Sequence, residues 1–127
     1  MIYVKDSQTS SIVTSSAIPV SGNLRLNTSV WTMIFNSSYI FGNTFYMNCE
    51  ITTGATVVTN HVYDNVFVMP EGYRSSITYT LSATCTHENY QSAQSVACLL
   101  VNGASISLCF PNNQNKYVFI SGHWRLR

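Results

Sequence analysis

Two alternating runs joined by Asn102-Gly103 constrain the fold of this chain more than any other feature of its sequence. In residues 95–101 and 104–110, apolar side chains alternate for the most part with polar or small ones, as in strands that are buried on one face. Asn-Gly is a preferred pair for a type I′ turn, because both central residues of that turn need a positive φ. Residues 95–110 are therefore predicted to form an antiparallel β-hairpin.

Short strands separated by turn residues are expected along the rest of the chain. Residues 76–83 alternate almost perfectly, and other strand-like runs cover 44–51, 62–69 and 117–121. Gly122 is expected to break the chain before a last strand at 123–127. No segment of helical length shows a 3.6-residue period. The pattern predicts an all-β fold of about eight strands, an antiparallel β-sandwich of jelly-roll type.

A single domain is expected, because a chain of 127 residues holds one hydrophobic core. Residues 1–20 are predicted to be an extended lead-in or the remnant of a stem, and residues 21–127 the β-sandwich. The N-terminus lacks the features of a signal peptide, and no apolar run is long enough to span a bilayer. The chain is thus either made in the cytoplasm or a piece of a longer protein, without membrane insertion.

The low charge of the chain narrows the classes of partner. Charged residues are only 9% of the sequence, so Ser, Thr, Asn and Gln supply most of the polar surface. The six basic residues are scattered and the net charge is +1, which leaves no basic stripe for nucleic acid. Such a surface suits a neutral polar ligand such as a sugar, and it equally suits an ordinary solvated sheet.

No motif predicts catalysis, a metal site or a cofactor. There are five acidic residues and no evident carboxylate pair of the kind that a glycosidase needs. His61 and Asp64 are three positions apart and would face opposite sides of a strand. The chain is therefore predicted not to be an enzyme. The cysteines form no C-x-x-C pair and are expected to be buried free thiols, with disulfides as the alternative in an oxidising medium; they are Cys49, Cys85, Cys98 and Cys109.

Two segments carry a recognisable pattern. One joins residues 42–48 to the turn Pro70-Glu71-Gly72-Tyr73-Arg74, and the other joins residues 101–107 to 118–124. Over roughly residues 30–127 the chain resembles the C-terminal receptor-binding (head) domain of tail-fibre and baseplate proteins of phages of Gram-positive bacteria. It departs from that pattern at Met69 and Ser75, where Leu and a second Pro are usual. The turn motif is interpreted as structural, with Tyr73 packing back and Arg74 binding carbonyl groups.

This resemblance implies a β-sandwich head that assembles as a homotrimer at the tip of the phage tail, after synthesis in the bacterial cytoplasm. It implies adsorption to a host cell-wall or surface saccharide without catalysis, and contact with other tail or baseplate proteins. Two alternatives remain open. One is a structural trimerisation or decoration module of the virion without a receptor of its own, and the other is a tail domain that hydrolyses a glycan.

A saccharide site is expected on loops at one end of the sandwich, because a rigid scaffold holds such loops while they vary. Two polar loops, 86–91 and 112–115, offer suitable groups, and Trp124 offers an aromatic face. Strand alternation puts His123 and Arg125 on the face opposite Trp124. The predicted ligand-binding residues are His87, Glu88, Tyr90 and Trp124, across a subunit boundary if needed. The alternative places Trp124 in the core and Tyr90 over a loop.

Overall fold

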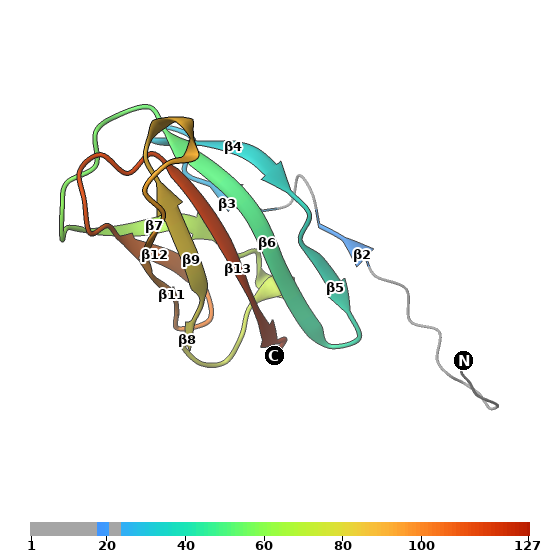
Figure 1. Cartoon of the computed structure of the whole chain (residues 1–127). Coiled ribbons are helices and arrows are strands. Elements are labelled where there is room, and N and C mark those ends of the chain that lie inside the picture. The colour runs from blue at the N-terminus through green and yellow to red at the C-terminus, as the bar shows by residue number, and fades with distance from the viewer. Residues whose placement is uncertain (1–17, 21–23) are drawn as a thin grey trace.

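The computed structural model describes residues 18–20 and 24–127, which form two antiparallel sheets packed face to face (Figure 1). The strands of the larger sheet are β2 (Ile18–Pro19), β4 (Trp31–Asn36), β5 (Tyr39–Phe41), β6 (Thr44–Thr53), β9 (Ser82–Thr86), β10 (Gln94–Ser95) and β13 (Tyr117–Arg125). Those of the smaller sheet are β3 (Arg25–Leu26), β7 (Val62–Val68), β8 (Tyr79–Thr80), β11 (Ala97–Val101) and β12 (Ser105–Cys109).

The seven-stranded sheet has the order β10-β9-β13-β6-β5-β2, with β4 also paired to β6, and the five-stranded sheet has the order β3-β7-β12-β11-β8. The predicted antiparallel β-sandwich is thereby confirmed. The described residues contain twelve strands rather than about eight, several of them only two residues long. The sole helical segments among them are the 3-10 turns η1 (Glu71–Tyr73) and η2 (Glu88–Tyr90).

Two predicted strand boundaries are wrong, because contacts between segments distant in the sequence set the actual ones. The expected strand at 76–83 divides between the sheets: β8 belongs to one and β9 to the other, as at a sandwich corner. The expected break at Gly122 does not occur, because β13 continues through it to Arg125. A Cβ at Gly122 would lie 2.7 Å from Cδ2 of Leu81, so this glycine makes room for Leu81.

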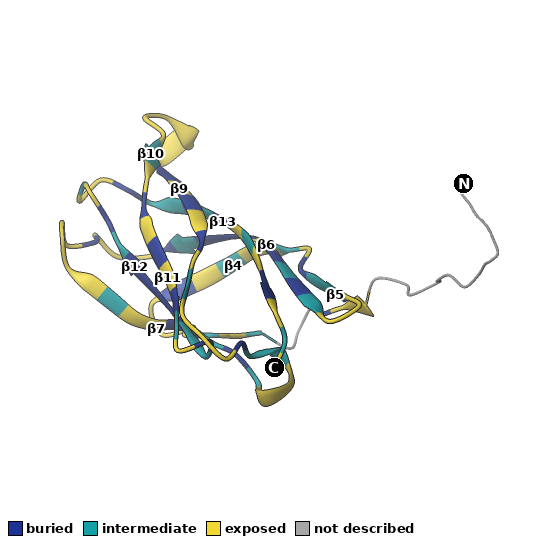
Figure 2. Cartoon of the chain, turned by 90° about the horizontal axis from the view of Figure 1, so that it is seen from below, coloured by how far each residue is buried: buried dark blue, intermediate teal, exposed yellow. Residues whose placement is uncertain are grey.

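The core lies between the inner faces of the two sheets. Exposed and buried residues alternate over the first four residues of β9 and of β11, as Figure 2 shows. The largest fully buried side chains come from both sheets and include Phe45, Phe67, Leu100, Ile120 and Trp124. Val20 is also fully buried and its N–H donates to Ser38 O, so residues 18–20 of the predicted lead-in belong to the packed domain. The rest of that lead-in lies outside the described residues.

The Asn102-Gly103 hairpin is confirmed. β11 pairs with β12 from Ala97↔Cys109 to Val101↔Ser105, and the two turn residues have φ of 52° and 68°. The Gly103 carbonyl accepts a hydrogen bond of 3.0 Å from the N–H of Ser75. The hairpin turn is thus fastened to the segment that follows the Pro70–Arg74 motif.

The Pro70–Arg74 motif has the structural role expected for it. Arg74 Nε donates to Met69 O at 2.9 Å, and the Tyr73 ring packs on Phe45 with 5.4 Å between ring centroids. The indole Nε1 of Trp124 donates to Tyr73 O at 2.8 Å. This turn therefore joins the end of β13 to the start of β6.

All four cysteines are free, as expected. Cys49, Cys85 and Cys98 are buried and Cys109 is half-buried. Burial raises the pKa of Cys49 and of Cys98 to about 12, and that of Cys85 to about 11, so these thiols stay neutral near pH 7. No helix of the described residues is long and apolar enough to cross a membrane.

A candidate ligand-binding hollow

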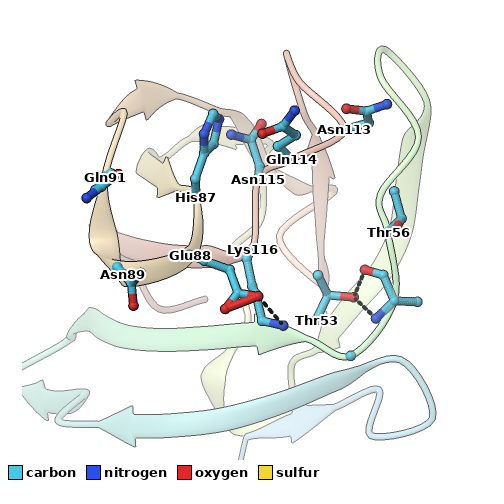
Figure 3. Close-up of a pocket in the computed structure, with 12 residues that line it drawn as sticks. Thr53, Thr56, His87, Glu88, Asn89, Gln91, Asn113, Gln114, Asn115 and Lys116 are labelled. Carbon is cyan, nitrogen blue, oxygen red and sulfur yellow. Dashed lines mark hydrogen bonds and ion pairs between the residues drawn. The ribbon is translucent and has the colours of Figure 1, made fainter.

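A polar hollow of about 580 Å³ lies at one end of the sandwich. Its walls are three segments: residues 53–56 at the end of β6, residues 87–91 after β9, and residues 113–116 before β13 (Figure 3). Of the twelve lining residues, only Gly54 and Ala55 lack a polar side chain. The two loops singled out in the sequence therefore meet at one site.

Strand pairing brings these loops together. Tyr117, the first residue of β13, pairs with Thr86 on one side and with Thr52 on the other. The backbone of Lys116 extends this ladder: its N–H donates to Thr86 O at 2.7 Å, and its carbonyl accepts from Thr53 N at 3.2 Å. The three loops are thus held together where they leave the seven-stranded sheet.

Several polar groups of the hollow are already used within the protein. Asn115 is buried; its amide donates to Gln94 Oε1 at 3.1 Å and its Oδ1 accepts from Asn112 N at 3.1 Å. Glu88 and Lys116 form an ion pair of 3.7 Å, drawn as a dashed line in Figure 3. These contacts shape the loops and cancel the formal charge of the hollow.

Other polar groups face the hollow without a protein partner. Nε2 of His87 makes no hydrogen bond among the described residues, but this atom is buried and is not open to a ligand. Five further side chains of the hollow make no hydrogen bond within the described part of the chain: those of Thr56, Asn89, Gln91, Asn113 and Gln114. Neutral donors and acceptors are therefore available to a ligand.

Tyr90 lies beside the hollow rather than in its lining. Its ring stacks on Tyr117 on the outer face of the seven-stranded sheet, with 4.4 Å between centroids. Its hydroxyl donates to Oε2 of Glu50 at 2.8 Å. This hydrogen bond to the carboxylate is the main cause that raises the pKa of Tyr90.

Trp124 is separated from the other three predicted site residues. It is 1% exposed and stacks on Phe45, with 4.5 Å between centroids. It stands seven positions after Tyr117 along β13, or about 23 Å at 3.3 Å per residue. The ring therefore belongs to the core at the opposite end of the sandwich, where no ligand in the hollow reaches it.

The sequence pointed to His87 and Glu88 but missed the 53–56 loop and Lys116. The signal that was present is the run of hydroxyl and small residues at 52–56, directly after a long predicted strand. Polar residues at a strand end often line a site, but pairing of β6 with β13 is needed to place them here.

No protein-family model matches the chain, and no curated protein matches it. Among solved structures, the crystal structure of the head domain of lactococcal phage bIL170, presented as a receptor-binding domain, matches with a TM-score of 0.57. The chain has the fold of a phage receptor-binding head. The match covers 91% of this chain and 100% of the bIL170 head domain, at 13% sequence identity. The resemblance noted in the sequence is thereby confirmed for the fold.

Proposed function

We propose that the chain is a receptor-binding head of a phage tail and that it adsorbs a host cell-surface saccharide in the hollow. The observation that carries this proposal is the gathering of unpartnered neutral amide and hydroxyl groups between three loops of a head-type sandwich, those of Thr56, Asn89, Gln91, Asn113 and Gln114. Planar amides and hydroxyls both donate and accept hydrogen bonds, as sugar hydroxyls require of their partners. The Glu88–Lys116 pair leaves no net formal charge to attract an ion.

Adsorption without catalysis fits the chemistry of the hollow. Glu88 is the only carboxylate among its lining residues, whereas glycoside hydrolysis usually takes two placed carboxyl groups. A sugar would be bound by hydrogen bonds and released unchanged. If host cell walls released reducing sugar on incubation with the protein, this part of the proposal would fail in favour of the hydrolytic alternative.

Loss of one hydrogen-bonding side chain in the hollow is expected to weaken saccharide binding. We expect Gln114→Ala and Asn113→Ala each to lower the affinity for a host cell-wall saccharide about fivefold, since one hydrogen bond contributes about 1 kcal/mol. Titration calorimetry with purified wall polysaccharide measures this. Asn43→Ala is the matched control, an exposed asparagine in the turn between β5 and β6 at the other end of the sandwich.

Binding by the wild type and equal binding by all three variants would place the site elsewhere. An array of cell-wall glycans that shows no binding to the wild type would favour the structural virion module without a receptor.

We also propose a homotrimer, carried at the tail tip and attached to other tail or baseplate proteins. Large hydrophobic side chains are exposed on β4 and β5, which follow one another along the same edge of β6. They include Ile34, Phe35 and Phe41. Apolar groups that cluster on a surface are stabilised when a further copy of the chain covers them.

Light scattering is expected to give three times the single-chain mass of 14.2 kDa. Phe35→Ser should shift the protein toward that single-chain mass, because it removes an apolar side chain from the proposed interface. Leu99→Ser is the control: Leu99 is also 39% exposed, but it lies on the five-stranded sheet. A wild type that scatters as 14.2 kDa would contradict the trimer.

A further inference from the structure

The loop that forms one wall of the hollow has an unfavourable backbone. Asn89, Tyr90 and Ser92 have φ of 60°, 58° and 57°, and none of them is a glycine. Residues with a Cβ resist this left-handed region, so such a conformation persists only where other contacts compensate for it. The shape of the 87–91 loop is therefore not fixed by its own backbone preference.

Two hydrogen bonds close this loop on itself. The N–H of His87 donates to Gln91 O at 2.8 Å, and the N–H of Tyr90 donates to His87 O at 3.2 Å. Neither bond fastens the loop to the sheet. The side chain of Tyr90 makes such a connection, since its ring stacks on Tyr117 and its centroid lies 6.0 Å from that of Phe119. The ion pair of the exposed Glu88 with Lys116 makes a second one.

The far end of Tyr90 reaches a buried carboxylate. Glu50 lies in the middle of β6, on the outer face of the sheet, and is 6% exposed. Its neighbours in the ladder are Phe119 on β13 and Phe35 on β4. Among the described residues it forms no ion pair, and Tyr90 is the side chain that donates to it. Burial of a carboxylate is costly unless a hydrogen-bond donor reaches it. The hydroxyl of Tyr90 is such a donor, and the same contact holds the loop against the sheet.

We infer that Glu50 is a positioning residue for the hollow. It does not line the hollow, yet it holds the hydroxyl of Tyr90 and thereby fixes the loop that presents His87, Glu88 and Asn89. The contact spans forty positions in the sequence and crosses β13 from β9 to β6. The consequence for saccharide affinity rests on the proposed function, whereas the positioning of the loop does not.

Hydrogen exchange of the loop amides tests this inference without a ligand. In Tyr90→Phe and in Glu50→Ala, the amides of His87 and Tyr90 should exchange at least about tenfold faster, because the loop opens more often. Glu50→Gln keeps an acceptor oxygen and should restore most of the protection. Tyr46→Phe is the control, since Tyr46 also stacks with a tyrosine on this face but its hydroxyl makes no hydrogen bond among the described residues.

Unchanged exchange at His87 and Tyr90 in Glu50→Ala would overturn the inference. So would an equal acceleration at the β11 and β12 amides, because that result means general destabilisation. The Tyr90 phenol should also titrate at a lower pH in Glu50→Gln, since the carboxylate raises its pKa.

Saccharide binding is then measured on the same variants. If the variants rank in the same order by loss of amide protection in the loop and by loss of saccharide affinity, the positioning role of Glu50 and the proposed function both hold. If the wild type binds no saccharide while the exchange pattern is as expected, the proposed function fails and the positioning role of Glu50 stands.

Discussion

Gly103→Ala is expected to lower the free energy of unfolding by about 3 kcal/mol. Gly103 has φ +68°, which costs an alanine about 1–2 kcal/mol. A Cβ there would also lie 2.0 Å from Ser75 O and 2.4 Å from Ser75 C, so backbone rather than a flexible side chain has to move. Overpacking of this kind adds about 1–3 kcal/mol.

Gly42→Ala separates these two contributions. Gly42 has φ +63°, but nothing lies within 4 Å of the Cβ position. This variant should therefore lose only the conformational part, about 1–2 kcal/mol. Urea unfolding of both variants measures the difference. Equal losses would mean that the hairpin turn moves away from Ser75 without cost, contrary to the Ser75 N–H hydrogen bond that fastens it.

Trp124→Ala should destabilise the protein by about 3–5 kcal/mol, the range for a large aromatic side chain removed from a core. The ring is 1% exposed, and its loss removes the stacking on Phe45 and the hydrogen bond to Tyr73 O. Trp124→Phe keeps an aromatic ring in the core and loses the indole N–H, so about 1–3 kcal/mol is expected. Far-UV circular dichroism during urea unfolding measures both variants.

The folded Trp124→Phe variant should bind saccharide as the wild type does, because Trp124 lies at the end of β13 away from the hollow. A tenfold loss of affinity in this variant would contradict the separation of Trp124 from the site. An unfolding free energy that stays unchanged in Trp124→Ala would contradict its place in the core.

Local rules of the chain were sufficient for the hairpin and the turn motif. Asn102-Gly103 encodes its own geometry, and Pro70–Arg74 forms bonds within five positions. The strand at 76–83 could not be divided correctly from its alternation, since the corner depends on where Leu81 meets β11: its N–H donates to Cys98 O. Strand ends that are set by contacts with distant strands cannot be predicted from one segment of the sequence.

The candidate site, too, was predictable only as far as the local sequence of each loop allows. Polar composition identified the loops around His87 and Asn113, because such residues rarely fill a core. That these loops meet residues 53–56 follows from the pairing of β13 with both β6 and β9. Trp124 and Tyr90 were assigned by chemical type alone, and their partners Phe45 and Glu50 are remote in sequence.

The length of β13 has a practical consequence. This strand links the end that carries the Pro70–Arg74 turn and the core stacking to the end that carries the three loops (Figure 1). The stacked core aromatics and the candidate site therefore lie at opposite ends of the sandwich, more than about 20 Å apart by strand length. Grafting the 54–56, 88–91 and 112–114 segments of another head domain onto this scaffold should change the saccharide that it binds under the proposed function. This requires that Glu50 is kept and that the grafted 88–91 segment has a tyrosine at the position of Tyr90.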